Sequence, residues 1–295
     1  MTKPLNVESV VRSRYSAAAE EKVQALCCPV DYNREFLKVI PAEVLERDYG
    51  CGDPSQHVRW GETVLDLGCG GGKICFIASQ VVGPQGRVIG VDMNDEMLGL
   101  ARRNQRAVGE AVGWHNVEFR KGRIQDLALD LERLDAELRA RPITGAEAWL
   151  AAEALAAELR ARHPLVATES VDVVVSNCVL NLVESTAKRK LFGEIFRVLR
   201  KTGRAVISDI VSDQTVPERL RQDGELWSGC IAGALTEAEF LGGFTEAGFA
   251  SARVLKRDAT PWRTVDGIEF RSLTVEAGKG NAASEARCCE PGKCC

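Results

Sequence analysis

The sequence predicts an α/β protein whose core is a doubly wound parallel sheet. From Thr63 onward, short apolar runs typical of buried strands alternate with longer amphipathic segments typical of helices. A glycine-rich turn follows the first run, in VLDLGCGGG, and the second run ends on an aspartate, in VIGVDM. In sheets of this kind, ligands bind beyond the carboxyl ends of the strands.

The predicted core covers residues 61–211. Its strands are expected at TVLDLG, RVIGVDM, VEFRKG, VDVVVSN and RAVISDIV, in chain order. Its helices are expected at GGKICFIASQVV, at DEMLGLARRNQRAV and over residues 188–199. Helices that separate successive strands indicate parallel pairing, because each connection must cross the sheet.

Residues 1–60 are expected to form an N-terminal helical cap. Apolar residues recur at helical spacing over 8–27, and this helix should end at the CCP sequence that follows. Pro41 fits the first turn of a shorter helix that stops near Gly50.

Residues 127–168 interrupt the alternation and predict an inserted helical hairpin. Two apolar stripes at helical spacing carry this prediction: Leu127, Leu131, Leu134 and Leu138, then Trp149, Ala152, Leu155 and Leu159. Charges fill the other faces. This favours a solvated appendage over a mobile lid or a dimer contact.

Residues 212–280 predict a C-terminal α+β segment, which we expect to bind substrate. It holds a helix near 237–247 and strands near ARVLKRD and FRSLTVEA. Residues 281–295 are polar apart from four cysteines, so we expect a flexible tail.

Composition excludes several classes of function. The net charge is −4 with no basic block, which argues against a nucleic-acid partner, since such binding needs Lys and Arg to neutralise phosphates. The N-terminus lacks the apolar core of a signal peptide, and no apolar stretch is long enough to span a membrane. We therefore expect a cytoplasmic protein. The oligomeric state is left open.

The eleven cysteines are the unusual part of the composition. An odd number, in a chain without an export signal, argues against a disulfide framework and favours reduced thiols. Such thiols are most often small buried hydrophobes, and sometimes ligands or nucleophiles. Cys178 in SNCVLNL directly follows an apolar run, so it should lie at the ligand-binding edge of the sheet.

The glycine loop and the next aspartate indicate a nucleotide-like cofactor. Asp66 lies two residues before Gly68, and glycines allow a ligand to approach the backbone closely. Asp92 could accept hydrogen bonds from a ribose diol. A glycine loop alone is weak evidence, because nicotinamide-dependent oxidoreductases have one too. That alternative would need a hydride-acceptor site, which the sequence does not reveal.

The pairing of the two motifs resembles the class I S-adenosylmethionine-dependent methyltransferases. The resemblance implies a Rossmann-like methyltransferase sheet and S-adenosylmethionine as cofactor. Position by position, it implies that Asp66, Gly68 and Gly70 line the methionine end and that Asp92 holds the ribose. The other positions implied at the cofactor are Cys69 through its backbone, Met93 beside the adenine, Ile124 in the adenine-edge loop, and Asn177.

The cysteine surroundings GGGKIC, SNCVLNL, GCIAGAL and ALCC closely resemble the arsenite methyltransferase family. The resemblance implies that Cys178 and Cys230 hold trivalent arsenic as substrate, and that Cys75 pairs with a site thiol during reduction. Cys28, or its neighbour Cys27, would be the fourth participant. Cys51 and Cys69, taken alone, fit a packing role.

The chemistry implied is methyl transfer to thiolate-bound arsenic. Trivalent arsenic is thiophilic and carries a lone pair that can attack a sulfonium methyl. Methylation raises arsenic to the pentavalent state, and two nearby thiols can return it to the trivalent state by forming a disulfide. A thiol reductant such as thioredoxin or glutathione would then restore the thiols.

Two alternatives remain open. A methyltransferase acting on an organic small molecule would need a general base, and His57, His115 and His163 offer no clear candidate. A non-catalytic arsenic-sequestering protein is suggested by the cysteines of residues 281–295.

Overall fold

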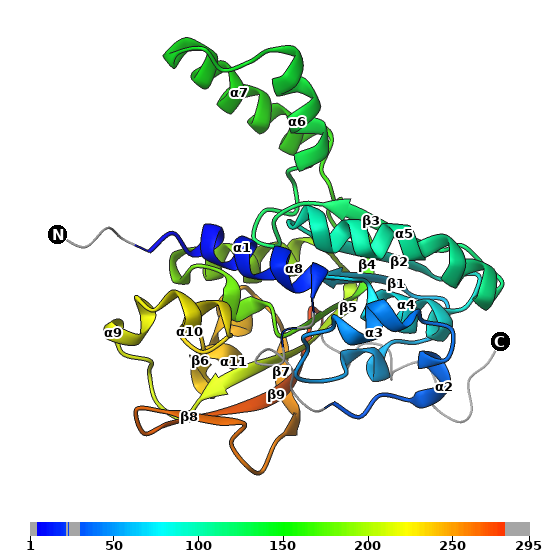
Figure 1. Ribbon diagram of the computed structural model, residues 1–295, viewed down its shortest axis with the longest axis vertical. Helices are drawn as coiled ribbons and strands as arrows, with labels where there is room; N and C mark the ends of the chain where they lie inside the picture. The colour runs from blue at the N-terminus through cyan, green and yellow to red at the C-terminus, as the bar shows by residue number, and fades with distance from the viewer. Residues whose placement is uncertain (1–4, 22, 24–29, 281–295) are drawn as a thin grey trace, which may run out of the picture.

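The computed structural model describes residues 5–21, 23 and 30–280. It confirms the predicted α/β class: one nine-stranded sheet with helices on both faces (Figure 1). The strands are β1 Thr63–Leu67, β2 Arg87–Asp92, β3 Val117–Lys121, β4 Val171–Asn177, β5 Leu199–Ser212, β6 Leu235–Thr236, β7 Ser251–Arg257, β8 Arg263–Val265 and β9 Ile268–Gly278. The helices are α1 Val7–Glu20, α2 Arg34–Leu37, α3 Ala42–Glu46, α4 Lys73–Val82, α5 Asp95–Val112, α6 Leu131–Ala140, α7 Ala146–Arg162, α8 Lys188–Val198, α9 Glu218–Arg221, α10 Gly224–Ser228 and α11 Glu237–Glu246.

The main path of the sheet runs β3-β2-β1-β4-β5-β9-β7, with β6 beside β5 and β8 beside β9. The first five strands of this path are parallel. The chain moves outward from β1 to β3, then returns to place β4 on the other side of β1. Ligands of doubly wound sheets bind at such a reversal, so the carboxyl ends of β1 and β4 mark the expected site.

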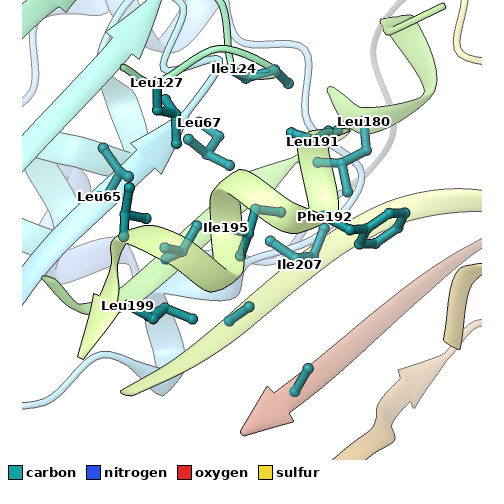
Figure 2. Close-up of a cluster of buried hydrophobic side chains, with 14 of the residues drawn as sticks. Leu65, Leu67, Ile124, Leu127, Leu180, Leu191, Phe192, Ile195, Leu199 and Ile207 are labelled. Carbon is teal, nitrogen blue, oxygen red and sulfur yellow. The ribbon is translucent and has the colours of Figure 1, made fainter. Parts of the chain in front are cut away.

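The core lies on both faces of the sheet, as side-chain alternation along β1 requires. Leu65 and Leu67 face one layer, in which α8 packs through residues such as Leu191 and Ile195 (Figure 2). Val64 faces the opposite layer, beneath α4 and α5. A parallel sheet covered on both faces holds the strand ends of the site rigidly.

The C-terminal strands extend the same sheet instead of forming a separate layer. β9 pairs antiparallel with β5, and β7 pairs antiparallel with β9. The sequence predicted strands here but not their partners, because the pairing joins segments far apart in the chain. As a result, residues 212–280 stand beside the carboxyl end of β5.

The predicted hairpin forms α6 and α7 and projects away from the rest of the molecule (Figure 1). Its two ends are joined by backbone hydrogen bonds from Val166 to Leu127 (2.8 Å) and from Leu165 to Ala128 (3.2 Å). The hairpin itself starts later than predicted, since Leu127 packs in the core of the sheet. Trp149 is 54% exposed and does not belong to the hairpin core.

The first helix ends at Glu20, earlier than the predicted residues 8–27. The Tyr49 hydroxyl donates to the carbonyl oxygen of Ala18 (2.9 Å) and accepts from the N–H of Val23 (3.1 Å). These bonds take up groups that a longer helix would use internally. Among the described residues, none of the helices combines the length and apolar character needed to cross a membrane.

Candidate functional site

The glycine loop between β1 and α4 has the backbone that its sequence predicts. Gly68, Gly70 and Gly72 have φ angles of 68°, 51° and 88°, a region that side chains disfavour. A Cβ at Gly68 would stand 2.3 Å from a methyl carbon of Val179, whereas the space around Gly70 is open. The loop therefore packs against the segment after β4 and leaves its centre free for a ligand.

Asp92, at the end of β2, organises this loop. Its carboxylate accepts hydrogen bonds from the N–H groups of Gly70 and Asn94, both at 2.9 Å. Burial raises the pKa of Asp92, and these N–H donors oppose the rise. The carboxylate keeps lone pairs for a further donor such as a hydroxyl.

A cavity of about 570 Å³ opens at the strand ends. Nine residues predicted from the sequence line it: Asp66, Gly68, Cys69, Gly70, Asp92, Met93, Ile124, Asn177 and Cys178. The cavity has the size of small-molecule sites. Cys178 is thus the predicted arsenic-holding residue that touches this cavity.

Helix α1 lines another side of the cavity, which sequence reasoning did not predict. Val7, Val11 and Tyr15 line it from α1. Glu8 pairs with Arg123 in the loop after β3, at 2.7 Å. The helical cap therefore forms one wall of the cavity.

Asn177 connects the cavity to a third thiol, that of Cys51. Its side-chain oxygen accepts from the N–H groups of Cys51 (2.9 Å) and Gly52 (3.0 Å). Its amide nitrogen donates to the Gly52 carbonyl oxygen (2.7 Å) and the Tyr32 hydroxyl (3.1 Å). The predicted cofactor residue thus holds the 51–52 segment against the end of β4.

Three thiols come together beyond the end of β4. The Cys230 thiol donates to the carbonyl oxygen of Cys178 at 3.2 Å, and the Cys51 and Cys178 sulfurs lie within 4.8 Å of each other. All three are buried, and burial raises the pKa of Cys51 and of Cys178. The sequence, taken alone, predicted a packing role for Cys51. Because its sulfur lies close to that of Cys178, the structure places Cys51 in the thiol cluster.

Both turns that carry Cys178 and Cys230 are strained. Each cysteine has a φ of 61°, which is uncommon outside glycine. Such conformations persist only when the surroundings impose them, and they concentrate at functional sites.

Buried polar groups around Asn181 impose these conformations. Asp209 accepts from the N–H of Leu180 at 2.8 Å, and the Asn181 amide donates to the carbonyl oxygen of Ile210 at 2.6 Å. Lys188 donates to the carbonyl oxygen of Gly233 at 2.5 Å and to the side-chain oxygen of Asn181 at 3.4 Å, so it joins the two turns. Burial lowers the pKa of Lys188 to about 8 and raises that of Asp209 to about 6.

Cys75 differs from the expectation. Its thiol donates to Asp66 at 3.2 Å and lies in contact with Cys69, above Gly90 of β2. It packs in the layer beneath α4, while Cys178 and Cys230 share another cluster. The phase of α4 turns the Cys75 side chain toward β2. Cys28 and Cys27 lie outside the described residues.

Asp66 lines the cavity from the end of β1 and is 2% exposed. Burial raises its pKa to about 7, while the Cys75 hydrogen bond opposes the rise. Burial raises the pKa of the Tyr15 hydroxyl on α1, and the neighbouring Cys230 and Cys178 thiols raise it further. Tyr15 had no signal in the sequence.

A family model described as a methyltransferase domain matches residues 59–248. The chain belongs to this methyltransferase family. The match includes the glycine loop, Asp92 and the turns of Cys178 and Cys230, and it agrees with the fold predicted from the two motifs.

Similar proteins of known function point to one group of methyltransferases, the arsenite methyltransferases. An arsenite methyltransferase of Halobacterium salinarum is 38% identical over 239 residues, which cover 78% of this chain and 50% of that protein. The arsenite methyltransferase of Aquipseudomonas alcaligenes is 33% identical over 234 residues, covering 78% and 57%. These findings confirm the predicted resemblance. The chain spans about half the length of these relatives.

A solved structure supports the same likeness. An arsenic(III) S-adenosylmethionine methyltransferase from Chlamydomonas reinhardtii superposes with a TM-score of 0.66 and 28% identity, covering 86% of this methyltransferase and 76% of that chain.

Proposed function

We propose that this methyltransferase transfers a methyl group from S-adenosylmethionine to trivalent arsenic held by thiolates. One observation carries the proposal: the sulfurs of Cys51, Cys178 and Cys230 gather at the cofactor cavity, with Cys178 in its lining. Sulfur is the ligand that trivalent arsenic prefers. The known activity of the similar proteins supports the same substrate.

The residues of the cavity suit S-adenosylmethionine. The open backbone at Gly70 allows close approach, and Asp92 can accept from a ribose diol. The Asp66 carboxyl lines the cavity. A cationic methionine end bound beside it would favour the ionised form of this carboxyl. When bound, the cofactor supplies an electrophilic methyl group on a sulfonium.

The thiols would bind arsenite by exchange. Each thiol proton leaves with an arsenic hydroxyl as water, so three thiols and As(OH)₃ give a trithiolate and three waters. The arsenic lone pair would be the nucleophile toward the methyl group that the cofactor supplies, so no general base would be needed. The turns of Cys178 and Cys230 would hold the arsenic toward the cavity, and α1, which lines the cavity, would limit access of water.

Cys51 and Cys178 are the pair we propose for the reduction step. Methylation leaves arsenic pentavalent, and loss of two thiolates as a disulfide returns two electrons to it. Two sulfurs within 4.8 Å can approach bonding distance with a small side-chain movement. A thiol reductant such as thioredoxin or glutathione would restore the pair, with Cys28 or Cys27 as a proposed relay. Reduced thiols suit a cytoplasmic location.

The same proposal divides the chain by role. Residues 61–211 would bind the cofactor, with 127–168 as an insertion, and residues 212–280 would contribute Cys230 to the substrate. Residues 1–60 would form the cap and contribute Cys51. Residues 281–295, for which the sequence predicts a flexible cysteine-rich tail, lie outside the described residues.

Purified protein incubated with arsenite, labelled S-adenosylmethionine and a dithiol reductant tests the proposal. We expect labelled methylated arsenic from the unsubstituted chain. Cys178→Ser and Cys230→Ser should lose turnover while cofactor affinity stays unchanged. Absence of methylated arsenic, or full activity of Cys178→Ser, would refute the proposal. Methylation of an organic acceptor without arsenic would favour the organic-substrate alternative.

A further inference from the structure

Cys51, Cys178 and Asp209 form a compact group of potential ligands from three separate segments. Their sulfur and carboxylate oxygen atoms all lie within 4.8 Å of one another. The residues are 5%, 5% and 1% exposed. Cys178 directly follows β4, Asp209 belongs to β5, and the Asn177 side chain at the end of β4 holds the segment that contains Cys51.

The Asp209 carboxylate can accept one partner beyond its present hydrogen bonds. One oxygen accepts from Leu180 (2.8 Å) and Asn181 (3.3 Å), and the other accepts from Ile210 (2.8 Å). An ionised carboxylate offers about four lone-pair positions, so one remains for a further partner. The backbone donors also hold the carboxylate in a fixed orientation.

Two thiolates and a carboxylate match a divalent cation better than they match arsenic. Trivalent arsenic is satisfied by three sulfurs and needs no oxygen ligand. Borderline and soft divalent ions accept mixed sulfur and oxygen sets in tetrahedral geometry, and three protein ligands leave a fourth position open.

We propose that Cys51, Cys178 and Asp209 bind a thiophilic divalent cation such as Zn²⁺ or Cd²⁺. Binding of M²⁺ to two thiols and one carboxylate releases two protons and leaves a complex of charge −1. A water molecule completes the tetrahedron. Entry is through the cofactor cavity, which Cys178 lines.

The cation and arsenite exclude each other, because both need Cys178. This consequence rests on the proposed function, whereas the binding of the cation does not. Zinc and cadmium are therefore inhibitors that compete with arsenite and leave cofactor affinity unchanged.

Cadmium binding to the full chain tests the site. The cysteines at 288, 289, 294 and 295 are replaced by serine in the reference protein, so that they do not compete. Calorimetry gives the affinity, and ¹¹³Cd magnetic resonance reports the ligand types. We expect one tight ion with mixed sulfur and oxygen ligands.

Asp209→Asn and Cys51→Ser should each weaken cadmium binding by about 10- to 100-fold or more, as the loss of groups that build a metal site does. The control Asp213→Asn changes an exposed carboxylate just beyond β5 and should leave the affinity unchanged. Cys51→Ser leaves the Asp209 contacts in place if Asp209→Asn fails to fold. Equal affinity in Cys51→Ser and the reference, or a sulfur-only cadmium signal, overturns the proposal.

A last comparison separates this site from the proposed function. Cys230→Ser should keep cadmium affinity within about threefold, because Cys230 is not one of the three protein ligands, yet it should lose arsenite methylation. Cadmium bound at the site by a protein that never methylates arsenite would refute the proposed function alone. Arsenite methylation without any cadmium at the site would refute the cation site alone.

Discussion

The Cys230 thiol donates a hydrogen bond to the carbonyl oxygen of Cys178 across 52 positions of sequence. Both residues have a φ of 61°. The contact joins a turn at the end of the parallel sheet to a turn of the C-terminal segment. The substrate site that we propose therefore depends on how closely two strained turns pack.

Gly233→Ala should disrupt this packing. A Cβ at Gly233 would stand 2.0 Å from the carbonyl oxygen of Asn181, so the two turns must separate. We expect arsenite affinity to fall at least about tenfold, which is about 1.4 kcal/mol, with cofactor affinity retained. In the control Gly193→Ala on α8, the new Cβ meets nothing within 4 Å, and helix propensity favours alanine. Calorimetric titration with arsenite measures both, and equal affinities would contradict the expectation.

Cofactor binding should release a proton below neutral pH. The pKa of Asp66 is about 7 in the cofactor-free protein, so the carboxyl is mostly protonated at pH 6. A cationic cofactor favours the carboxylate, so affinity rises as the pH rises toward 7 and then levels off. Calorimetry at pH 6 in buffers of different ionisation enthalpy measures the proton. Asp66→Asn should bind the cofactor more weakly, and its cofactor binding should lack the proton release that comes from this carboxyl. Identical proton release in both proteins would refute the assignment.

Cys51 and Cys75 should behave differently when each is replaced by serine. Cys75→Ser keeps a donor to Asp66 and should retain methyl transfer. Cys51→Ser removes the partner of Cys178 and should lower repeated turnover at least about tenfold, or about 1.4 kcal/mol in barrier. Mass spectrometry after one turnover without reductant should find a Cys51–Cys178 disulfide. A disulfide between Cys75 and Cys178 would contradict this pairing.

The hairpin of α6 and α7 should be removable. Backbone hydrogen bonds already join Leu127 to Val166 and Ala128 to Leu165, so a short glycine-serine linker can replace residues 131–162. Asp126 loses Arg160 but keeps Lys190 at 3.2 Å. We expect methyl transfer to persist and the free energy of unfolding to change by less than about 2 kcal/mol, since few core contacts are lost. Loss of cofactor binding in the shortened chain would instead give the hairpin a role at the cavity.

Local motifs predicted which residues meet at this edge of the sheet and line the cavity. The glycine loop and Asp92 are set by a strand, a turn and a helix that are adjacent in sequence, so spacing alone brings them to one sheet edge. The same holds for Cys178, which directly follows β4.

The thiol partners were harder to predict, because side-chain contacts across the fold decide them. Cys51 reaches the site through hydrogen bonds with Asn177, 126 positions away. Cys75 has a suitable place in the sequence, but the phase of α4 directs its thiol toward Gly90. Tyr15 reaches the site because α1 packs over the cavity, and the sequence around Tyr15 does not predict this packing.

X-ray absorption at the arsenic edge, on the protein with equimolar arsenite, tests the central proposal most directly. The tail cysteines are replaced by serine so that they do not bind arsenic. We predict a first shell of three sulfurs at the arsenic, reduced to a mixed sulfur and oxygen shell in Cys178→Ser. A shell dominated by oxygen in the protein with Cys178 intact would contradict the thiolate site.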